Sequence, residues 1–160
     1  MIESLLPFFE WCEETSLGQL VRNSVWLFPA IQSVHLLGLS ALGGCIVVLD
    51  LRMLGFGLTR QPVALIAKAV QPWLLASLAL QLLTGFPLFM SEAVKCFHNP
   101  SFWLKMSTLP VALLFTFTIR RAVAGRAGIG TTALTRGVAA VSLLLWFTVA
   151  AAGRWISFSS

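Results

Sequence analysis

The sequence predicts an all-α protein, an up-and-down bundle of four transmembrane helices with a short interfacial helix before the first. Three observations support this fold class. The 160 residues are 58% hydrophobic and 11% charged, with a mean hydropathy of +0.87, whereas a soluble domain is typically about a quarter charged. Four apolar stretches reach the roughly 20 residues that a helix needs to cross the hydrocarbon of a bilayer. Short connections between them favour antiparallel neighbours.

The chain is expected to form one integral membrane domain, residues 1–160. Within residues 1–20, apolar Leu5, Phe8 and Trp11 alternate with acidic residues, which predicts a helix lying in the outer membrane interface. The first 14 residues contain no Lys or Arg, whereas a secretory signal begins with a basic region. We therefore expect the first spanning helix to be retained.

Four spans follow in order, and we predict them at residues 25–49, 63–90, 102–119 and 137–156. Residues that break helices separate them: Gly55, Gly57 and Pro62, then Asn99 and Pro100, then Gly125, Gly128 and Gly130. Asn99 or Ser101 is suited to cap the third span. A helix satisfies its own backbone polar groups, as lipid requires.

The distribution of basic residues predicts the orientation, because the side richer in Lys and Arg faces the cytoplasm. One side carries seven such residues, namely Arg52, Arg60, Lys68, Arg120, Arg121, Arg126 and Arg136. The other side carries four, namely Arg22, Lys95, Lys105 and Arg154. Four tryptophans, which favour the interface, fall at the poorer side: Trp11, Trp26, Trp103 and Trp155. Both termini are therefore predicted to face outward.

His35 is the main candidate for a functional residue, because it lies well inside the first span. Ionisable groups at that depth are costly and usually face the protein interior. Gly38 makes room one turn away, and histidine is a common axial ligand of haem iron. Two interpretations stay open: His35 ligates a haem, or it hydrogen-bonds a neighbouring helix that the glycines bring close. Gln81, Thr84 and Gly85 reach the same depth in an antiparallel bundle and are the candidate partners or pocket wall.

Two basic residues at the outer ends of spans are further candidates for contacts with a cofactor. Lys105 opens the third span, where it either anchors the helix in the interface, ligates as a neutral amine, or pairs with a haem propionate. Arg154 ends the fourth span beside Gly153, where it either anchors the helix or clamps a carboxylate. His98, in the outer connection, is interpreted as a solvated loop histidine.

Other polar residues are interpreted as structural. Asp50, at the inner end of the first span, is expected to pair with Arg120 or Arg121 rather than to relay protons. Cys12 and Cys96 both fall on the outer side, where a disulfide between them is an alternative to two free thiols. The basic residues are spread along the chain, which argues against nucleic-acid binding. The sequence contains no Ser-His-Asp, paired-carboxylate or phosphate-loop pattern, so we assign no catalytic residue and leave enzymatic activity open.

Five segments in a fixed order carry a family resemblance: Trp26-Leu27-Phe28-Pro29, His35-Leu36-Leu37-Gly38, Asp50-Leu51-Arg52-Met53-Leu54-Gly55, Asn99-Pro100-Ser101-Phe102-Trp103-Leu104-Lys105-Met106 and Gly153-Arg154-Trp155-Ile156. This pattern resembles a family of bacterial four-helix membrane proteins classified as a domain of unknown function. It is more distantly similar to the copper-resistance-D-like proteins and the membrane-bound haem-containing protoporphyrinogen oxidases. The likeness to those oxidases implies haem b, with His35 and Lys105 at the positions of their important histidine and lysine. The resemblance to the bacterial family implies the bacterial inner membrane, where the outward termini that the basic residues predict would be periplasmic.

Three functions are therefore compatible with the sequence. The first is a haem-b protein for electron transfer or redox chemistry, with His35 as metal ligand and Gly38, Gln81, Lys105 and Arg154 around the cofactor. The second is a non-catalytic subunit or assembly factor, with the lipid bilayer and other membrane subunits or a second copy as partners. The third is a carrier for a small solute or a soft metal, using Cys45, Met90 and Met106.

Overall fold

The computed structural model describes residues 3–156, and all the regular elements among them are helical. Four stretches are long and apolar enough to cross a membrane: α3 (Leu27–Leu54), α4 (Val63–Ser91), the continuous stretch Pro100–Arg126 and α8 (Ala133–Ile156). The third stretch comprises α6 (Pro100–Phe115), the π-helical turn η2 (Thr116–Arg120) and α7 (Arg121–Arg126). The predicted all-α fold with four spanning helices is confirmed, and the protein is a multi-pass membrane protein.

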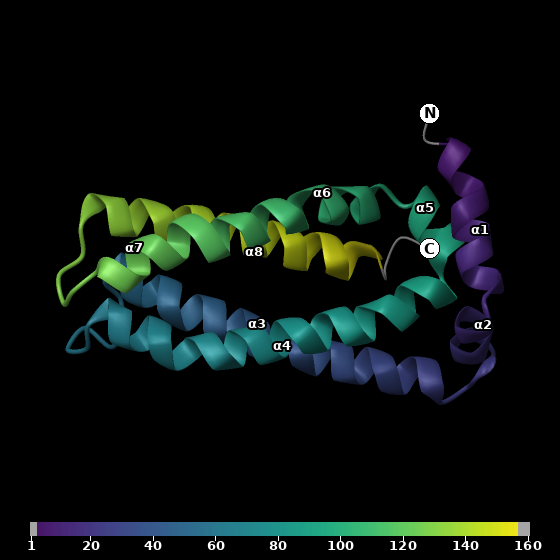
Figure 1. Ribbon diagram of the computed structural model, residues 1–160, viewed down its shortest axis with the longest axis horizontal. Helices are drawn as coiled ribbons and strands as arrows, with labels where there is room; N and C mark the ends of the chain where they lie inside the picture. Colours follow the sequence, from purple (N-terminus) through teal and green to yellow (C-terminus); the bar gives the residue numbers. More distant parts are fainter. Residues whose placement is uncertain (1–2, 157–160) are drawn as a thin grey trace.

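The four spans form two antiparallel pairs that lie along each other (Figure 1). α3 packs against α4, the third span packs against α8, and α3 also contacts α8. One end of the bundle carries the connections at residues 55–62 and 127–132, and we call it the loop end. The opposite end is crossed by α1 (Leu6–Glu14), α2 (Ser16–Asn23) and α5 (Ala93–His98) (Figure 1), and we call it the capped end.

The first span extends further than the sequence predicts, because two charged residues near its end are buried in protein. Residue 49 was the predicted end, since Asp50 and Arg52 follow it, but α3 continues to Leu54. The guanidinium of Arg52 donates to the carbonyls of Gln61 at 2.7 and 2.9 Å and of Ile129 at 2.7 Å. It thus joins the two connections of the loop end. α3 then ends at Gly55, whose φ of +96° suits glycine.

The third and fourth spans also differ at the loop end from their predicted bounds of 102–119 and 137–156. The third continues through η2 to Arg126, and α8 begins at Ala133. Within η2, the hydroxyl of Thr116 accepts a hydrogen bond from the indole of Trp146 at 2.9 Å. That contact gives the buried Trp146 a partner for its polar edge.

The N-terminal segment forms two helices rather than the single interfacial helix predicted for residues 1–20. Thr15 separates them: its hydroxyl donates to the carbonyl of Cys12 and accepts from the amide of Gly18 at the start of α2. Phe9 and Cys12 are buried in a cluster with residues of α4, α5 and α6, while Phe8 and Trp11 are exposed. The segment therefore covers the end of the bundle with one face and leaves an apolar face outward.

Candidate functional site

His35 lies on α3 and faces α4, where its Nδ1 is 2.7 Å from the hydroxyl of Thr84. The same hydroxyl is 2.6 Å from the carbonyl of Leu80, one turn earlier on α4. A carbonyl only accepts, so the single hydroxyl hydrogen of Thr84 is donated to Leu80. The hydroxyl must then accept from Nδ1–H of His35. The neutral ring is thereby fixed in the tautomer that leaves the lone pair on Nε2.

The hydrogen bond to Thr84 depends on a close approach of the two helices. A β-carbon added to Gly85 would lie 3.3 Å from Cε1 of His35, and one added to Gly38 would lie 3.2 Å from Cδ2 of Leu80. The side chain of Leu80 thus fills the room beside Gly38. The two glycines bring α4 against α3, as helix packing in membranes commonly requires. Of the three candidates that the sequence offers, Thr84 is the hydrogen-bond partner of His35.

Gln81 supplies the second notable polar group at this depth. Its side chain packs towards Gly38, since Cδ of Gln81 is 3.8 Å from a β-carbon placed there. Both polar atoms of its amide are buried and have no hydrogen-bond partner among the described residues. An unsatisfied buried amide costs about 1–3 kcal/mol. A polar ligand beside Gln81 would remove that cost.

Lys105 lies on α6 and packs against α8. Its Nζ is 3.5 Å from a β-carbon placed on Gly153, so Gly153 accommodates the lysine side chain. The structure thus gathers His35, Thr84 and Gln81 between α3 and α4, whereas Lys105 lies between α6 and α8. Arg154 is exposed at the end of α8.

The remaining candidates from the sequence do not join this group. His98 is exposed on α5, with its Nδ1 bonded to the carbonyl of Val94 at 3.0 Å. Met90 is buried in the cluster at the capped end, Cys45 packs against the central cluster and Met106 is 42% exposed. Within residues 3–156, no three His, Cys, Asp or Glu side chains gather into a metal-binding group. These positions give no support to a soft-metal carrier.

Asp50 is fully buried and forms a salt bridge with Arg120, as the sequence predicts for Arg120 or Arg121. Nε of Arg120 donates to one carboxylate oxygen at 2.6 Å, and the hydroxyl of Ser142 donates to the other at 2.6 Å. The guanidinium also reaches the carbonyl of Ile46 at 3.2 Å. This contact joins α3, the third span and α8. Ser142 has no signal in the sequence, because a single serine in an apolar stretch is common.

Cys12 and Cys96 are both buried in the cluster at the capped end, and both are free thiols. Burial raises the pKa of the Cys96 thiol to about 11, and the nearby carboxylate of Glu92 adds to the shift. Burial likewise raises the pKa of the Cys12 thiol. Such thiols are poor nucleophiles and behave as small apolar side chains.

The chain was compared with curated proteins, solved structures and family models. Comparison with curated proteins found no match, and comparison with solved structures found none either. The model of one family does match, and its match runs over residues 8–159. That range includes every spanning helix, the His35 group and the salt bridge of Asp50, so the chain belongs to the family of unknown function DUF6644.

Proposed function

We propose that this protein binds haem b within the membrane, with His35 as the residue that would hold it, and serves electron transfer or redox chemistry in the bacterial inner membrane. The hydrogen bond from His35 to Thr84 carries the proposal. A histidine that ligates a metal usually donates its other ring N–H to a fixed acceptor, which sets the tautomer and the ring orientation. His35 has this arrangement, with Nε2 left to bind.

The residues around His35 fit such a group. The buried amide of Gln81 lacks a hydrogen-bond partner in the described chain, so a bound polar group would complete it. Bound haem supplies one-electron chemistry, which the side chains alone lack.

The protein's own residues would bind and orient the group. The hydroxyl of Thr84 accepts from Nδ1–H of His35 and keeps the proton there, and the backbone carbonyl of Leu80 orients that hydroxyl. Lys105 serves either as a second ligand through its neutral amine or as a partner for a propionate, and Arg154 serves as a propionate clamp. The apolar spans keep water away from the iron, which tunes its redox potential.

An optical spectrum of the purified protein tests the proposal. Protein from haem-supplied cells should show a Soret band, and His35→Ala should abolish it. His98→Ala is the matched control, because His98 lies on α5 and bonds only within that region; its spectrum should equal that of the parent. A colourless parent protein, or an unchanged band in His35→Ala, would refute haem ligation by His35.

A further inference from the structure

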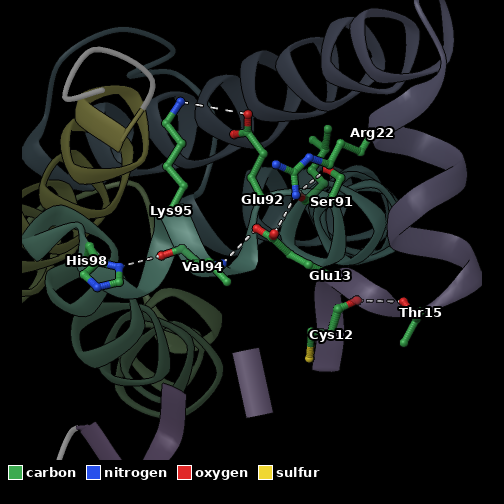
Figure 2. A network of polar contacts seen from close by, with 10 residues as sticks. Cys12, Glu13, Thr15, Arg22, Ser91, Glu92, Val94, Lys95 and His98 are labelled. Atoms are coloured by element: carbon green, nitrogen blue, oxygen red, sulfur yellow. Dashed lines mark hydrogen bonds and ion pairs between the residues drawn. The ribbon is translucent and has the colours of Figure 1, made fainter. Parts of the chain in front are cut away.

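A cavity of about 360 Å³ opens at the capped end, between α2, α3 and the junction of α4 with α5. Four charged side chains line it: Glu13, Arg22, Glu92 and Lys95. Its apolar wall comes from Val25, Phe28 and Pro29 at the start of α3. Figure 2 shows the charged side chains coming together from α1, α2 and α5. The cavity therefore combines both signs of charge with an apolar wall.

The four charged side chains differ in how far contacts within the protein already occupy them. Glu13 accepts from Arg22 at 2.7 Å and from the backbone amide of Val94 at 3.0 Å, and its side chain is only 15% exposed (Figure 2). Lys95 and Glu92 stand 3.9 Å apart, beyond hydrogen-bonding distance, and their side chains are 39% and 41% exposed. Arg22 is 61% exposed. The side chains of Arg22, Lys95 and Glu92 can therefore still bind a ligand from outside the protein.

The position of the cavity along the bundle indicates whether a ligand reaches it from the hydrocarbon of the membrane or from the headgroup region. Phe28 lies seven residues before His35, and Ser91, which also lines the cavity, lies seven residues after Thr84. The cavity therefore lies on the α3–α4 seam, about two helical turns outside the His35 site. Exposed Trp11 and Trp26 belong to the same end of the bundle, and tryptophan favours headgroup level. The cavity opens where lipid headgroups lie.

We propose that this cavity binds the headgroup of an aminophospholipid with a primary ammonium, such as phosphatidylethanolamine. Arg22 and Lys95 hold the phosphate diester, and Glu92 accepts from the ammonium. The glycerol end lies against Phe28 and Pro29, from where the acyl chains continue into the hydrocarbon. A phosphatidylcholine headgroup carries a cation but has no N–H to donate, and phosphatidylglycerol adds no cation to that of Lys95 beside Glu92. Hydrogen bonding thus favours the primary amine over choline, and charge favours it over glycerol.

Native mass spectrometry of the full chain tests the proposal. The protein is released from nanodiscs holding equal amounts of phosphatidylethanolamine, phosphatidylcholine and phosphatidylglycerol with identical acyl chains. We expect phosphatidylethanolamine to be retained about threefold to tenfold more often than either of the others, as loss of one hydrogen bond of ordinary net strength implies. Glu92→Gln should remove the preference, and Lys95→Gln should lower retention of both phosphatidylethanolamine and phosphatidylglycerol.

Two matched variants keep the test specific. Glu14→Gln neutralises an exposed acid at the same end outside the cavity, and Lys68→Gln neutralises an exposed lysine near the loop end. Both should keep the parent's preference, and the thermal unfolding of all variants should confirm that they are folded. Equal retention of the three lipids, a preference for phosphatidylglycerol, or an unchanged preference in folded Glu92→Gln would overturn the proposal.

Discussion

At the residue scale, the hydroxyl of Thr84 decides what His35 can do. It accepts from Nδ1 of His35 and donates to Leu80, so it fixes both the tautomer and the ring plane. Thr84→Val keeps the shape of the side chain and removes the hydroxyl. We expect haem affinity to fall about 10–100-fold, the usual effect of removing such a supporting contact. Titration of the haem-free protein with haem, followed in the Soret region, measures this.

Thr118→Val is the control for that substitution, because Thr118 is exposed and its hydroxyl bonds only to the carbonyl of Leu114 within its own span. Its affinity for haem should match that of the parent. If Thr84→Val also binds haem as tightly as the parent, the hydroxyl has no part in orienting His35. A loss in both variants would point to a general effect of threonine on the bundle.

The partner of His35 was predictable because of its depth. Antiparallel spans with the predicted limits place Gln81, Thr84 and Gly85 opposite His35, and the structure shows that Thr84 is the residue that bonds it. The charged cavity at the capped end was not predictable. Its charged members come from α1, α2, α5 and the junction of α4 with α5, and the sequence gives no sign of how short helices fold over a bundle end.

At the element scale, Gly18 sets how closely the cap lies on the bundle. A β-carbon at Gly18 would lie 2.7 Å from the carbonyl oxygen of Met90 and 2.9 Å from those of Cys12 and Glu13. All three obstacles are backbone atoms, which cannot rotate away. Gly18→Ala should therefore push α2 off α4 and destabilise the protein by about 1–3 kcal/mol. Thermal unfolding in detergent measures the change.

Gly43→Ala is the control for Gly18→Ala, because a β-carbon there meets nothing within 4 Å. Alanine is the better helix former, so Gly43→Ala should leave the stability unchanged or raise it slightly. Equal stability of Gly18→Ala and the parent would show that the cap does not need this close approach. The position of Gly18 could not be inferred from sequence, because its neighbours on α4 are distant in the chain.

The helices themselves were largely predictable, as was the start of the second span at residue 63, but the other three limits at the loop end were not. The length of an apolar stretch locates a spanning helix. A charged residue, however, looks the same in the sequence whether it is exposed to water or paired inside the protein. Asp50 and Arg52 mark the predicted end of the first span, yet both are buried inside the fold. Their partners lie on other elements, so α3 gains a further turn that hydropathy alone excludes.

At the scale of the whole molecule, the buried salt bridge of Asp50 and Arg120 joins three spans, with Ser142 as the third member. Replacing one partner leaves the other charge buried and unpaired, which typically costs about 3–5 kcal/mol. Asp50→Leu and Arg120→Leu should each lower the free energy of unfolding by about that amount. Unfolding of the parent and both variants in mixed detergent measures the difference.

The double variant Asp50→Leu/Arg120→Leu separates the cost of an unpaired buried charge from the effect of altered side-chain packing. With both charges gone, no unpaired charge remains, so its loss should be smaller than the sum of the two single losses. Additive losses would mean that each side chain stabilises the bundle independently.

The orientation of the whole bundle rests on its basic residues, and the structure refines their count. Arg52 and Arg120 are buried in protein contacts, which leaves five exposed at or near the loop end: Arg60, Lys68, Arg121, Arg126 and Arg136. At the capped end, Arg22, Lys95 and Arg154 are exposed. The loop end therefore still carries more exposed basic residues than the capped end, so we predict that the loop end is cytoplasmic and the capped end faces outward.

Reporter fusions in bacterial cells test this orientation. Alkaline phosphatase is active only outside the cytoplasm, and green fluorescent protein fluoresces when it stays inside. Fused after residue 160, the phosphatase should be active and the fluorescent protein dark; fused after Ile129, in the connection at the loop end, the pattern should reverse. A bright fluorescent fusion at the C-terminus would place the charged cavity in the cytoplasmic leaflet. The excess of exposed basic residues would then have failed to orient the bundle.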